Sequence, residues 1–275
     1  MGIRHEDISF FEKQAENIDH TFKLLQLLMC LNILLHNQPT MNQTIASPKP
    51  FYTHAWLYFL LAMAVIIAGF FPSFFNNLKQ TDLLHHVHGM SATAWLLLLV
   101  VQPLLYSRGQ ISLHRKLGKV SFVLVPLLLF GGVKMVQLMI RRQAEYPPME
   151  AFRLSFIDVV SMIAFVGFYG MAIYHRSTTG LHARYMAATV ILLIPPGLTR
   201  LLLRFPGVDS FTKGLNINFI LIEIALLLLL LDDKKRDGSF SRPYLILTAI
   251  IVFLHATLPF ARHWQWWQNF MNGIV

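Results

Sequence analysis

The sequence is divided into seven apolar blocks separated by short polar or charged segments, and this division limits the possible fold more than any other feature. A helix of about 20 apolar residues crosses the hydrocarbon core of a bilayer. Because that core offers no water to backbone polar groups, such a chain satisfies them within helices. The sequence therefore predicts an all-α, polytopic transmembrane helical bundle of about seven spans, at residues 55–72, 83–106, 119–140, 154–174, 184–203, 215–231 and 243–261.

Composition and charge agree with a membrane location. The chain is 55% hydrophobic and 13% charged, with a mean hydropathy of +0.52, which is too apolar for an ordinary soluble domain of 275 residues. The net charge of +9 comes from Lys and Arg at the ends of the apolar blocks, where they meet lipid headgroups. We expect the lipid bilayer as a partner and no nucleic acid. The single Cys30 excludes an internal disulfide and a cysteine-based zinc site.

The first 50 residues differ from the rest, so we divide the chain into an N-terminal extension with linker, 1–50, and a transmembrane helical domain, 51–275. The apolar part of the extension is too short to span a membrane and predicts an interfacial helix or a docking segment. It also lacks the basic start and small-residue cleavage site of a signal peptide. A natural start at Met41, with a functionless upstream extension, is an equal alternative.

The distribution of basic residues predicts the orientation of the bundle. The loops after the second, fourth and sixth blocks carry ten Lys and Arg residues, and the opposite side carries seven. By the positive-inside rule, this bias places the N-terminus in the cytoplasm and the C-terminus outside. Trp264, Trp266 and Trp267 in the tail are then expected at the outer headgroup layer.

Polar residues from several blocks are expected at one depth near the outer surface. On the second block, His85 and His88 share a helical face with Trp95 and Gln102. Ionisable groups inside a membrane cost at least ~2.5–3.5 kcal/mol each, which disfavours chance placement. We therefore predict an outward-facing chamber lined by His85, His88, Lys134, Asp158, Arg200 and His255.

Two further predictions concern charge inside the bundle. His182 and Arg200 are separated by 18 residues, or five helical turns, so Arg200 should share the depth of Asp158 on the adjacent helix. We predict an ion pair between Asp158 and Arg200, with helix packing alone as the alternative role. Glu223, near the middle of the sixth block, is the candidate proton carrier. Pro195 and Pro196 should kink the fifth block.

A weaker histidine group lies toward the cytoplasmic side and comprises His54 together with three candidate ligands, His114, His175 and His182. Arg115, Arg176 and Arg184 are close to these histidines in the sequence, and contacts with headgroups or loops are their commoner role.

Three functions fit these residues. In the first, haem b is held by His88 and His255, with His85 beside them and Lys134 and Arg200 near the propionates. Two of the weaker histidine group could hold a second haem, and an electron-transfer protein or a quinone would be the partner. In the second, His85, His88, His255 and Asp158 bind zinc or another divalent metal for hydrolysis. The third is proton-coupled transport of a small solute.

The segments HHVHGMSATAWLLLLVVQPLL, SLHRKLGKVS, HARYMAAT and PPGLTRLL resemble a group of uncharacterised bacterial inner-membrane proteins. The resemblance runs from about Phe51 to the seventh block, and it implies the fold and an inner-membrane location without an agreed activity. Histidines at both ends of a bundle are also loosely similar to cytochrome b561, in which four central helices carry one haem ligand each. Here only the second of the corresponding blocks offers an outer histidine. The matching motif residues are His85, His88, Gly89, Trp95, Gln102, His114, Arg115, Gly118, His182, Arg184 and Arg200.

Overall fold

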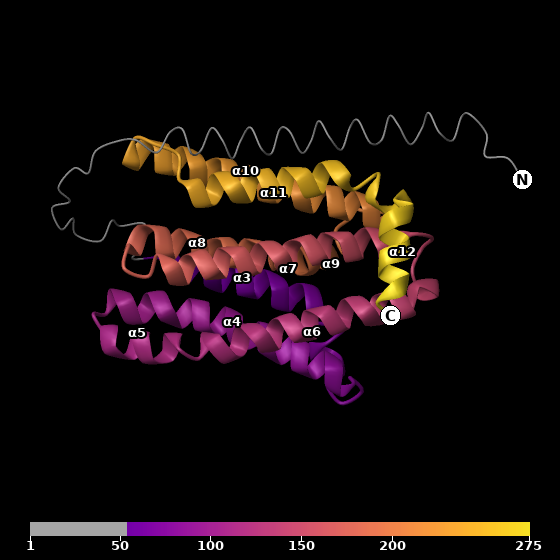
Figure 1. Ribbon diagram of the computed structural model, residues 1–275, viewed down its shortest axis with the longest axis horizontal. Coiled ribbons are helices and arrows are strands. Elements are labelled where there is room, and N and C mark those ends of the chain that lie inside the picture. The colour runs from indigo at the N-terminus through magenta and orange to yellow at the C-terminus, as the bar shows by residue number, and fades with distance from the viewer. Residues whose placement is uncertain (1–53) are drawn as a thin grey trace, which may run out of the picture. The chain divides into compact units, whose positions relative to one another are not determined.

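The computed structural model describes residues 54–275, which form a bundle of helices with no strand among them (Figure 1). This architecture confirms the predicted all-α fold class. The predicted extension, residues 1–50, lies outside the described residues. The helices are α3 (Ala55–Phe70), α4 (Leu83–Ser107), α5 (Ile111–Gly118), α6 (Ser121–Arg141), α7 (Glu150–Tyr174), α8 (Thr179–Ile191), α9 (Ile194–Leu202), α10 (Phe211–Asp237), α11 (Arg242–Thr257) and α12 (Gln265–Gly273).

Helix length and composition support a membrane protein. In the described range, four helical segments are long and apolar enough to cross a bilayer, and the bent pair α8 and α9 adds a fifth if it counts as one span. The first four are α4, α7, α10 and the run Ile111–Arg141, which comprises α5 and α6. Helices α3 and α11 are apolar but shorter. The count of seven spans therefore stays a prediction.

Local sequence explains where the helices begin and end. The Asp82 carboxylate accepts a hydrogen bond from the His85 backbone N–H at 2.9 Å and so caps the start of α4. Ser210 caps α10 in the same way, since its hydroxyl accepts from the Lys213 N–H at 3.3 Å. Helix α10 ends at Gly238, whose φ of 72° suits a residue without a side chain.

The fifth block is broken, as predicted from Pro195 and Pro196. Helix α8 ends at Ile191, α9 starts at Ile194, and the two helix axes differ by 42°. Proline has no N–H, so the hydrogen bonds that would join the two halves are lost, while both prolines are tolerated in the first turn of α9.

The backbones of α3 and α9 approach closely where two glycines meet. A Cβ atom placed on Gly69 would lie 2.0 Å from the carbonyl oxygen of Gly197, so neither position has room for a side chain. Arg204 donates a hydrogen bond at 2.9 Å to the Gly69 carbonyl. The second half of the broken block is therefore fixed against the first helix of the described chain.

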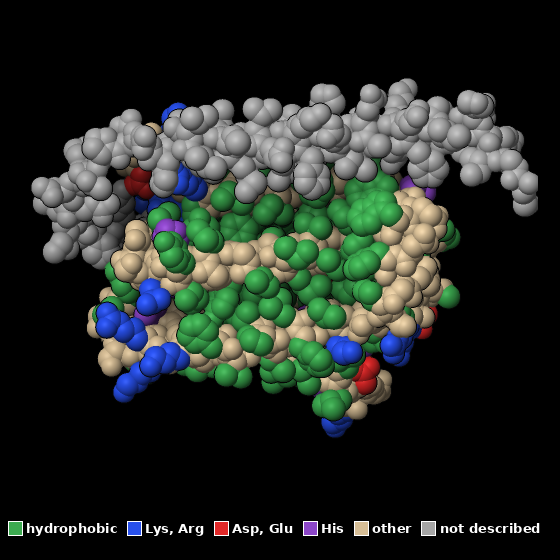
Figure 2. All heavy atoms as spheres, viewed as in Figure 1, with side chains coloured by type: hydrophobic (Ala, Val, Ile, Leu, Met, Phe, Trp, Pro, Cys, Tyr) green, Lys and Arg blue, Asp and Glu red, His purple; other side chains and the backbone are tan. Residues whose placement is uncertain are grey.

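Apolar side chains fill the interior and also cover much of the outside. Trp95, Phe219, Leu226 and Ile251 are completely buried in the core. Figure 2 shows hydrophobic side chains across the middle of the visible face and Lys and Arg near its two ends. An apolar belt between charged ends is the surface that a bilayer accepts.

The C-terminal helix α12 runs across one end of the bundle (Figure 1) and contacts α6 and α7. Trp267 is buried in this contact, and its Nε1–H donates to the Phe152 carbonyl at 2.9 Å. Trp266 is 54% exposed. Of these two tail tryptophans, Trp267 therefore packs into the protein, while Trp266 presents the surface expected of a headgroup contact.

Candidate functional site

Two histidines from distant parts of the sequence meet where α4 ends and α8 begins. We call this region the basic end, because Arg108, Arg115 and Arg176 lie there, on α5 and in the adjoining loops. His114 lies on α5 and His182 lies in the first turn of α8, and both are half-buried. Their ring centres are 6.5 Å apart and the ring planes are inclined by 74°. We call these two residues the imidazole pair.

Each ring of the imidazole pair is held through its Nδ1 atom. His182 Nδ1 lies 2.8 Å from the Ala172 carbonyl oxygen, and His114 Nδ1 lies 3.3 Å from the Gln102 carbonyl oxygen. A carbonyl only accepts, so each Nδ1 is the donor. In a neutral ring, the proton on Nδ1 leaves a lone pair on Nε2, and a backbone carbonyl is a common anchor for a metal-binding histidine.

The separation of the two rings suits a shared metal centre. A metal–nitrogen bond is about 2.0–2.1 Å long, so with the ring centre about 1.1 Å beyond each nitrogen, two opposed imidazoles have centres about 6.3 Å apart. The observed separation of the imidazole pair is 6.5 Å.

Contacts from α4 and α7 complete the surroundings of the imidazole pair. The Gln102 side chain donates from Nε2 to the His114 carbonyl at 3.2 Å and so ties α5 to α4. The Tyr106 ring lies 6.1 Å from the His114 ring. His175, the third member of the group predicted from the sequence, instead stacks on Tyr185 at 5.7 Å. The structure therefore brings together two of the three predicted histidines.

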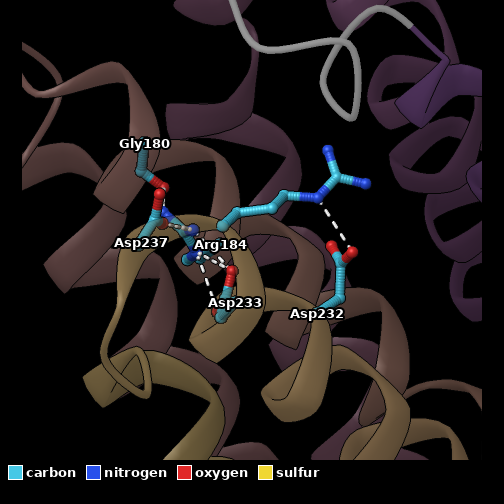
Figure 3. A network of polar contacts seen from close by, with 6 residues as sticks. Gly180, Arg184, Asp232, Asp233 and Asp237 are labelled. Atoms are coloured by element: carbon cyan, nitrogen blue, oxygen red, sulfur yellow. Dashed lines mark hydrogen bonds and ion pairs between the residues drawn. The ribbon is translucent and has the colours of Figure 1, made fainter.

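An ion-pair network fixes α8 against α10 beside the imidazole pair (Figure 3). Arg184 binds both oxygens of Asp233 through Nε, at 3.0 and 3.1 Å, and its Nη2 atom contacts Asp237 at 2.6 Å. The Asp233 side chain is only 4% exposed. Asp232, on the outer side of the same turn, pairs with Arg236 at 2.8 Å. The buried pair restrains the turn of α8 that carries His182.

The predicted outer histidines of α4 have local partners. His85 Nδ1 contacts both carboxylate oxygens of Asp82, at 2.8 and 2.9 Å. The hydrogen bond from the His85 backbone N–H, followed by the one from its ring, holds the pKa of the Asp82 carboxyl below its usual value. His88 packs against Gly131 of α6, and its Nδ1 is buried without a hydrogen bond in the described part of the chain. His85 therefore acts as part of a helix cap.

The predicted ion pair between Asp158 and Arg200 is wrong as a direct contact. Their charges interact, but no Asp158–Arg200 contact within 4.0 Å occurs in residues 54–275. Arg200 instead donates to the Pro196 carbonyl at 2.9 Å, and its guanidinium lies 4.5 Å from the centre of the Phe70 ring. The prediction counted five turns along a straight helix, whereas the break before α9 redirects Arg200 toward α3.

Lys134 lies in a separate contact near the C-terminus. Its Nζ donates to the Gln137 side chain at 3.1 Å, and Gln137 donates to the Ile274 carbonyl at 2.9 Å. This chain of hydrogen bonds joins α6 to the residues after α12. Lys134 thus has a structural partner that the sequence did not suggest.

His255 of α11 meets Glu223 and Asn216 of α10, and we call these three residues the α10–α11 triad. His255 Nδ1 lies 2.8 Å from Glu223 Oε1, and His255 Nε2 lies 3.2 Å from Asn216 Oδ1. The imidazole also stacks on Phe219, with ring centres 5.4 Å apart. Because both ring nitrogens are engaged, His255 does not present the free lone pair that the predicted His88–His255 haem ligation requires.

The predicted four-residue metal site is not assembled. Among residues 54–275, no group of three or more His, Cys, Asp or Glu side chains has an arrangement that could hold a metal ion. His85 is occupied by Asp82 and His255 by Glu223. The set His85, His88, His255 and Asp158 shares a predicted depth, but its members contact different neighbours.

A buried ion pair at the opposite end was missed by sequence reasoning. Arg153 is 1% exposed, contacts Glu150 one turn earlier and donates to Thr212 Oγ1 at 2.9 Å. Arg262 lies 3.7 Å from Glu150. The available signal was the spacing of Glu150 and Arg153, which are neighbours on one helical face.

Comparison of the chain with family models, with curated proteins and with solved structures gives no match.

Proposed function

We propose that this protein is a membrane redox protein that holds haem b between His114 and His182. One observation carries the proposal. Two imidazoles from α5 and α8 lie with their ring centres 6.5 Å apart, and each is held by a hydrogen bond from Nδ1 to a backbone carbonyl. This arrangement leaves both Nε2 atoms for a ligand between the rings.

The number of protein ligands favours haem over a single metal ion. A structural zinc site takes four protein ligands and a catalytic site three. Haem brings four pyrrole nitrogens of its own and needs only axial ligands from the protein. The imidazole pair supplies two ligands, which matches the requirement of a six-coordinate haem.

Basic residues beside the imidazole pair would pair with the haem propionates. Arg115 and Lys116 follow His114 directly on α5, and both are exposed. Arg176 lies between His175 and the start of α8 and is also exposed. Arginine and lysine form charge-assisted hydrogen bonds with carboxylates. By the positive-inside rule, we place this end of the bundle at the cytoplasmic face of a bacterial inner membrane.

Haem with two histidine ligands supplies single-electron transfer, at a potential set by its ligands and surroundings. The protein's own contribution is to orient the two rings. The carbonyls of Gln102 and Ala172 fix the tautomer of His114 and His182, and Arg184 fixes α8 on α10. A membrane quinone or another electron carrier would be the partner.

The test is a visible spectrum of the full-length protein, expressed with haem precursor and purified in mild detergent. We expect a Soret band that His114→Ala and His182→Ala each abolish. His175→Ala is the matched control, because His175 lies at the same end but stacks on Tyr185, and it should keep the band. His255→Ala should also keep it.

Other results would replace the proposal. A protein without a Soret band but with stoichiometric zinc on elemental analysis would point to the metal-dependent hydrolase. A protein with neither haem nor metal would leave proton-coupled transport of a small solute as the better hypothesis. A Soret band that survives in the His114→Ala, His182→Ala double variant would place the haem elsewhere.

A further inference from the structure

The α10–α11 triad has a hydrogen-bond order that fixes where its protons lie. Asn216 donates from Nδ2 to the Thr212 carbonyl one turn earlier, at 2.7 Å. Because that carbonyl only accepts, the amide nitrogen must point to it and the amide oxygen must point the other way. Asn216 Oδ1 therefore faces His255 Nε2 as an acceptor, at 3.2 Å.

The orientation of Asn216 determines the state of the imidazole. Since Oδ1 accepts, His255 Nε2 must carry a proton. On the other side of the ring, Nδ1 and Glu223 Oε1 are 2.8 Å apart, and a hydrogen bond between them needs a second proton. This second proton resides either on the imidazole, next to a carboxylate, or on the carboxyl group, next to a neutral imidazole.

Both arrangements leave the pair with zero net charge. Protonated His255 with ionised Glu223 sums to zero, and so does neutral His255 with protonated Glu223. Loss of the shared proton leaves one uncompensated negative charge between two apolar helices, which is costly away from water. The pair therefore has one proton whose binding changes its charge.

We propose that Glu223 and His255 form a proton-binding site within the apolar part of the bundle, which holds and releases one proton. On release, the hydrogen bond between Nδ1 and Oε1 is broken and the proton passes to water or to a neighbouring acceptor, with no bond to carbon formed or cleaved. Asn216 keeps Nε2 protonated throughout, so the exchanged proton is the one that His255 shares with Glu223.

The site lies at the surface of the bundle and is held in one geometry. The Glu223 and His255 side chains are 27% and 22% exposed, so neither is sealed in the core. Phe219 stacks on the imidazole and holds its plane. A proton site needs both properties, because it must exchange its proton and recover the same hydrogen bond afterwards.

Several charged groups on the neighbouring elements have partners of their own, whereas Asp158 interacts with Arg200 through its charge alone. Besides the Glu223–His255 contact itself, no ion pair within 4.0 Å reaches either residue in the described part of the chain. On the elements packed against α10 and α11, the contacts are Lys213 with Asp209, Arg153 with Glu150, Arg184 with Asp233, Arg204 with the Gly69 carbonyl, and Arg200 with the Pro196 carbonyl, near Asp158.

This site is separate from the proposed haem site. Glu223 precedes Asp233, at the basic end, by ten residues of α10, a rise of about 15 Å along the helix axis. The proposal therefore does not depend on haem binding, and variants at the two sites should have independent effects.

The experiment is infrared difference spectroscopy of the full-length protein in detergent between acid and alkaline pH, in water and in deuterium oxide. The signal of the site is the part of the wild-type difference spectrum that is absent from Glu223→Gln. We expect this part to be a carboxylic-acid band that becomes a carboxylate band as the pH rises if Glu223 carries the shared proton, or a shifted carboxylate band together with an imidazole band if His255 carries it. His255→Asn should move the transition to another pH, because the carboxyl group loses its partner.

Asp232→Asn is the matched control, because Asp232 is a carboxylate on the same helix with an exposed partner, and it should remove only its own bands and leave the Glu223 signal unchanged. A Glu223 signal that His255→Asn leaves unchanged would overturn the proposal. If that variant does not fold, nitrogen NMR of the histidine rings in the wild-type protein decides instead. We expect one ring whose Nε2 stays protonated at every pH while its Nδ1 signal titrates, and a ring set without such a member would reject the proposal. Any Soret band should be retained in Glu223→Gln, so failure of the proton-site proposal can be distinguished from failure of the haem proposal.

Discussion

The imidazole pair and the α10–α11 triad use the same side chain in opposite ways. In the imidazole pair, each histidine donates from Nδ1 to a backbone carbonyl, and its Nε2 has no hydrogen bond to residues 54–275. In the triad, both ring nitrogens of His255 form hydrogen bonds with side chains, Nδ1 with the Glu223 carboxyl group and Nε2 with the Asn216 amide. The second nitrogen therefore decides whether a membrane histidine is suited to a ligand or to a proton.

The partners of the two regions differ in charge as well. Ala172 and Gln102 contribute neutral backbone carbonyls to the imidazole pair. A neutral imidazole held in this way offers the lone pair of its other nitrogen to a metal. Glu223 contributes a carboxyl group that shares a proton with the ring. The comparison gives four predictions, beginning with the largest expected change.

Replacement of one axial ligand should change the proposed haem without removing it. His182→Met keeps a soft ligand in place, and histidine–methionine ligation raises the reduction potential of haem. We expect an altered visible spectrum and a higher midpoint potential in His182→Met, measured by redox titration. His255→Met is the control, and an equal shift there would show that the two regions do not differ as described.

Removal of the buried carboxylate beside the imidazole pair should destabilise the basic end. Loss of one partner of a buried ion pair costs about 3–5 kcal/mol, and because Asp237 still pairs with Arg184, we expect about 3 kcal/mol for Asp233→Asn. Asp232→Asn, one residue earlier and 32% exposed, should change stability by less than about 1 kcal/mol. Denaturant unfolding in detergent measures both, and equal losses would contradict the assigned burial.

Loss of the amide in the triad should have a moderate effect confined to that region. Asn216→Leu leaves the His255 Nε2–H without its acceptor, and an unsatisfied polar group costs about 1–3 kcal/mol. We expect that loss in denaturant unfolding, together with an unchanged Soret band. An altered Soret band would mean that the triad and the imidazole pair are coupled.

The smallest effect is expected from acid at the cap of α4. Hydrogen bonds from His85 lower the pKa of Asp82, so the folded state favours the ionised carboxylate. This stabilisation is complete above the ordinary aspartate pKa of about 3.9 and is lost as the pH falls through the lower folded value. Asp82→Ala should cost about 1 kcal/mol at neutral pH, as for other helix caps, and reduce the acid dependence of thermal unfolding. An unchanged acid slope would refute the assignment.

Much of the fold follows from the sequence because apolar length and proline chemistry are local properties. The predicted blocks 83–106 and 154–174 correspond to α4 and α7, and Pro195 with Pro196 marks the observed break. The sequence ISLHRKLG was assigned to a loop on account of its charges, yet it forms α5. Its histidine and its exposed basic residues lie on different sides of a short helix, which a hydropathy window does not resolve.

The candidate site was less accessible to sequence reasoning. Distance from a span end estimates depth, but contact also requires two helices to be neighbours with the right rotation. His88 and His255 share a predicted depth, although one packs on α6 and the other on α10. His114 and His182 meet only because α5 folds back along α4 and α8 follows α7. These rotations depend on tertiary packing, such as the glycine at 131 that accommodates His88.

The glycine contact between α3 and α9 has a consequence for motion. The two backbones touch at Gly69 and Gly197, and Arg204 donates a hydrogen bond to the Gly69 carbonyl. Helix α9 therefore cannot rotate about the break at residues 192–193 unless α3 moves with it. Because α3 is the first described helix, a rotation of α9 would be transmitted to the start of the described chain.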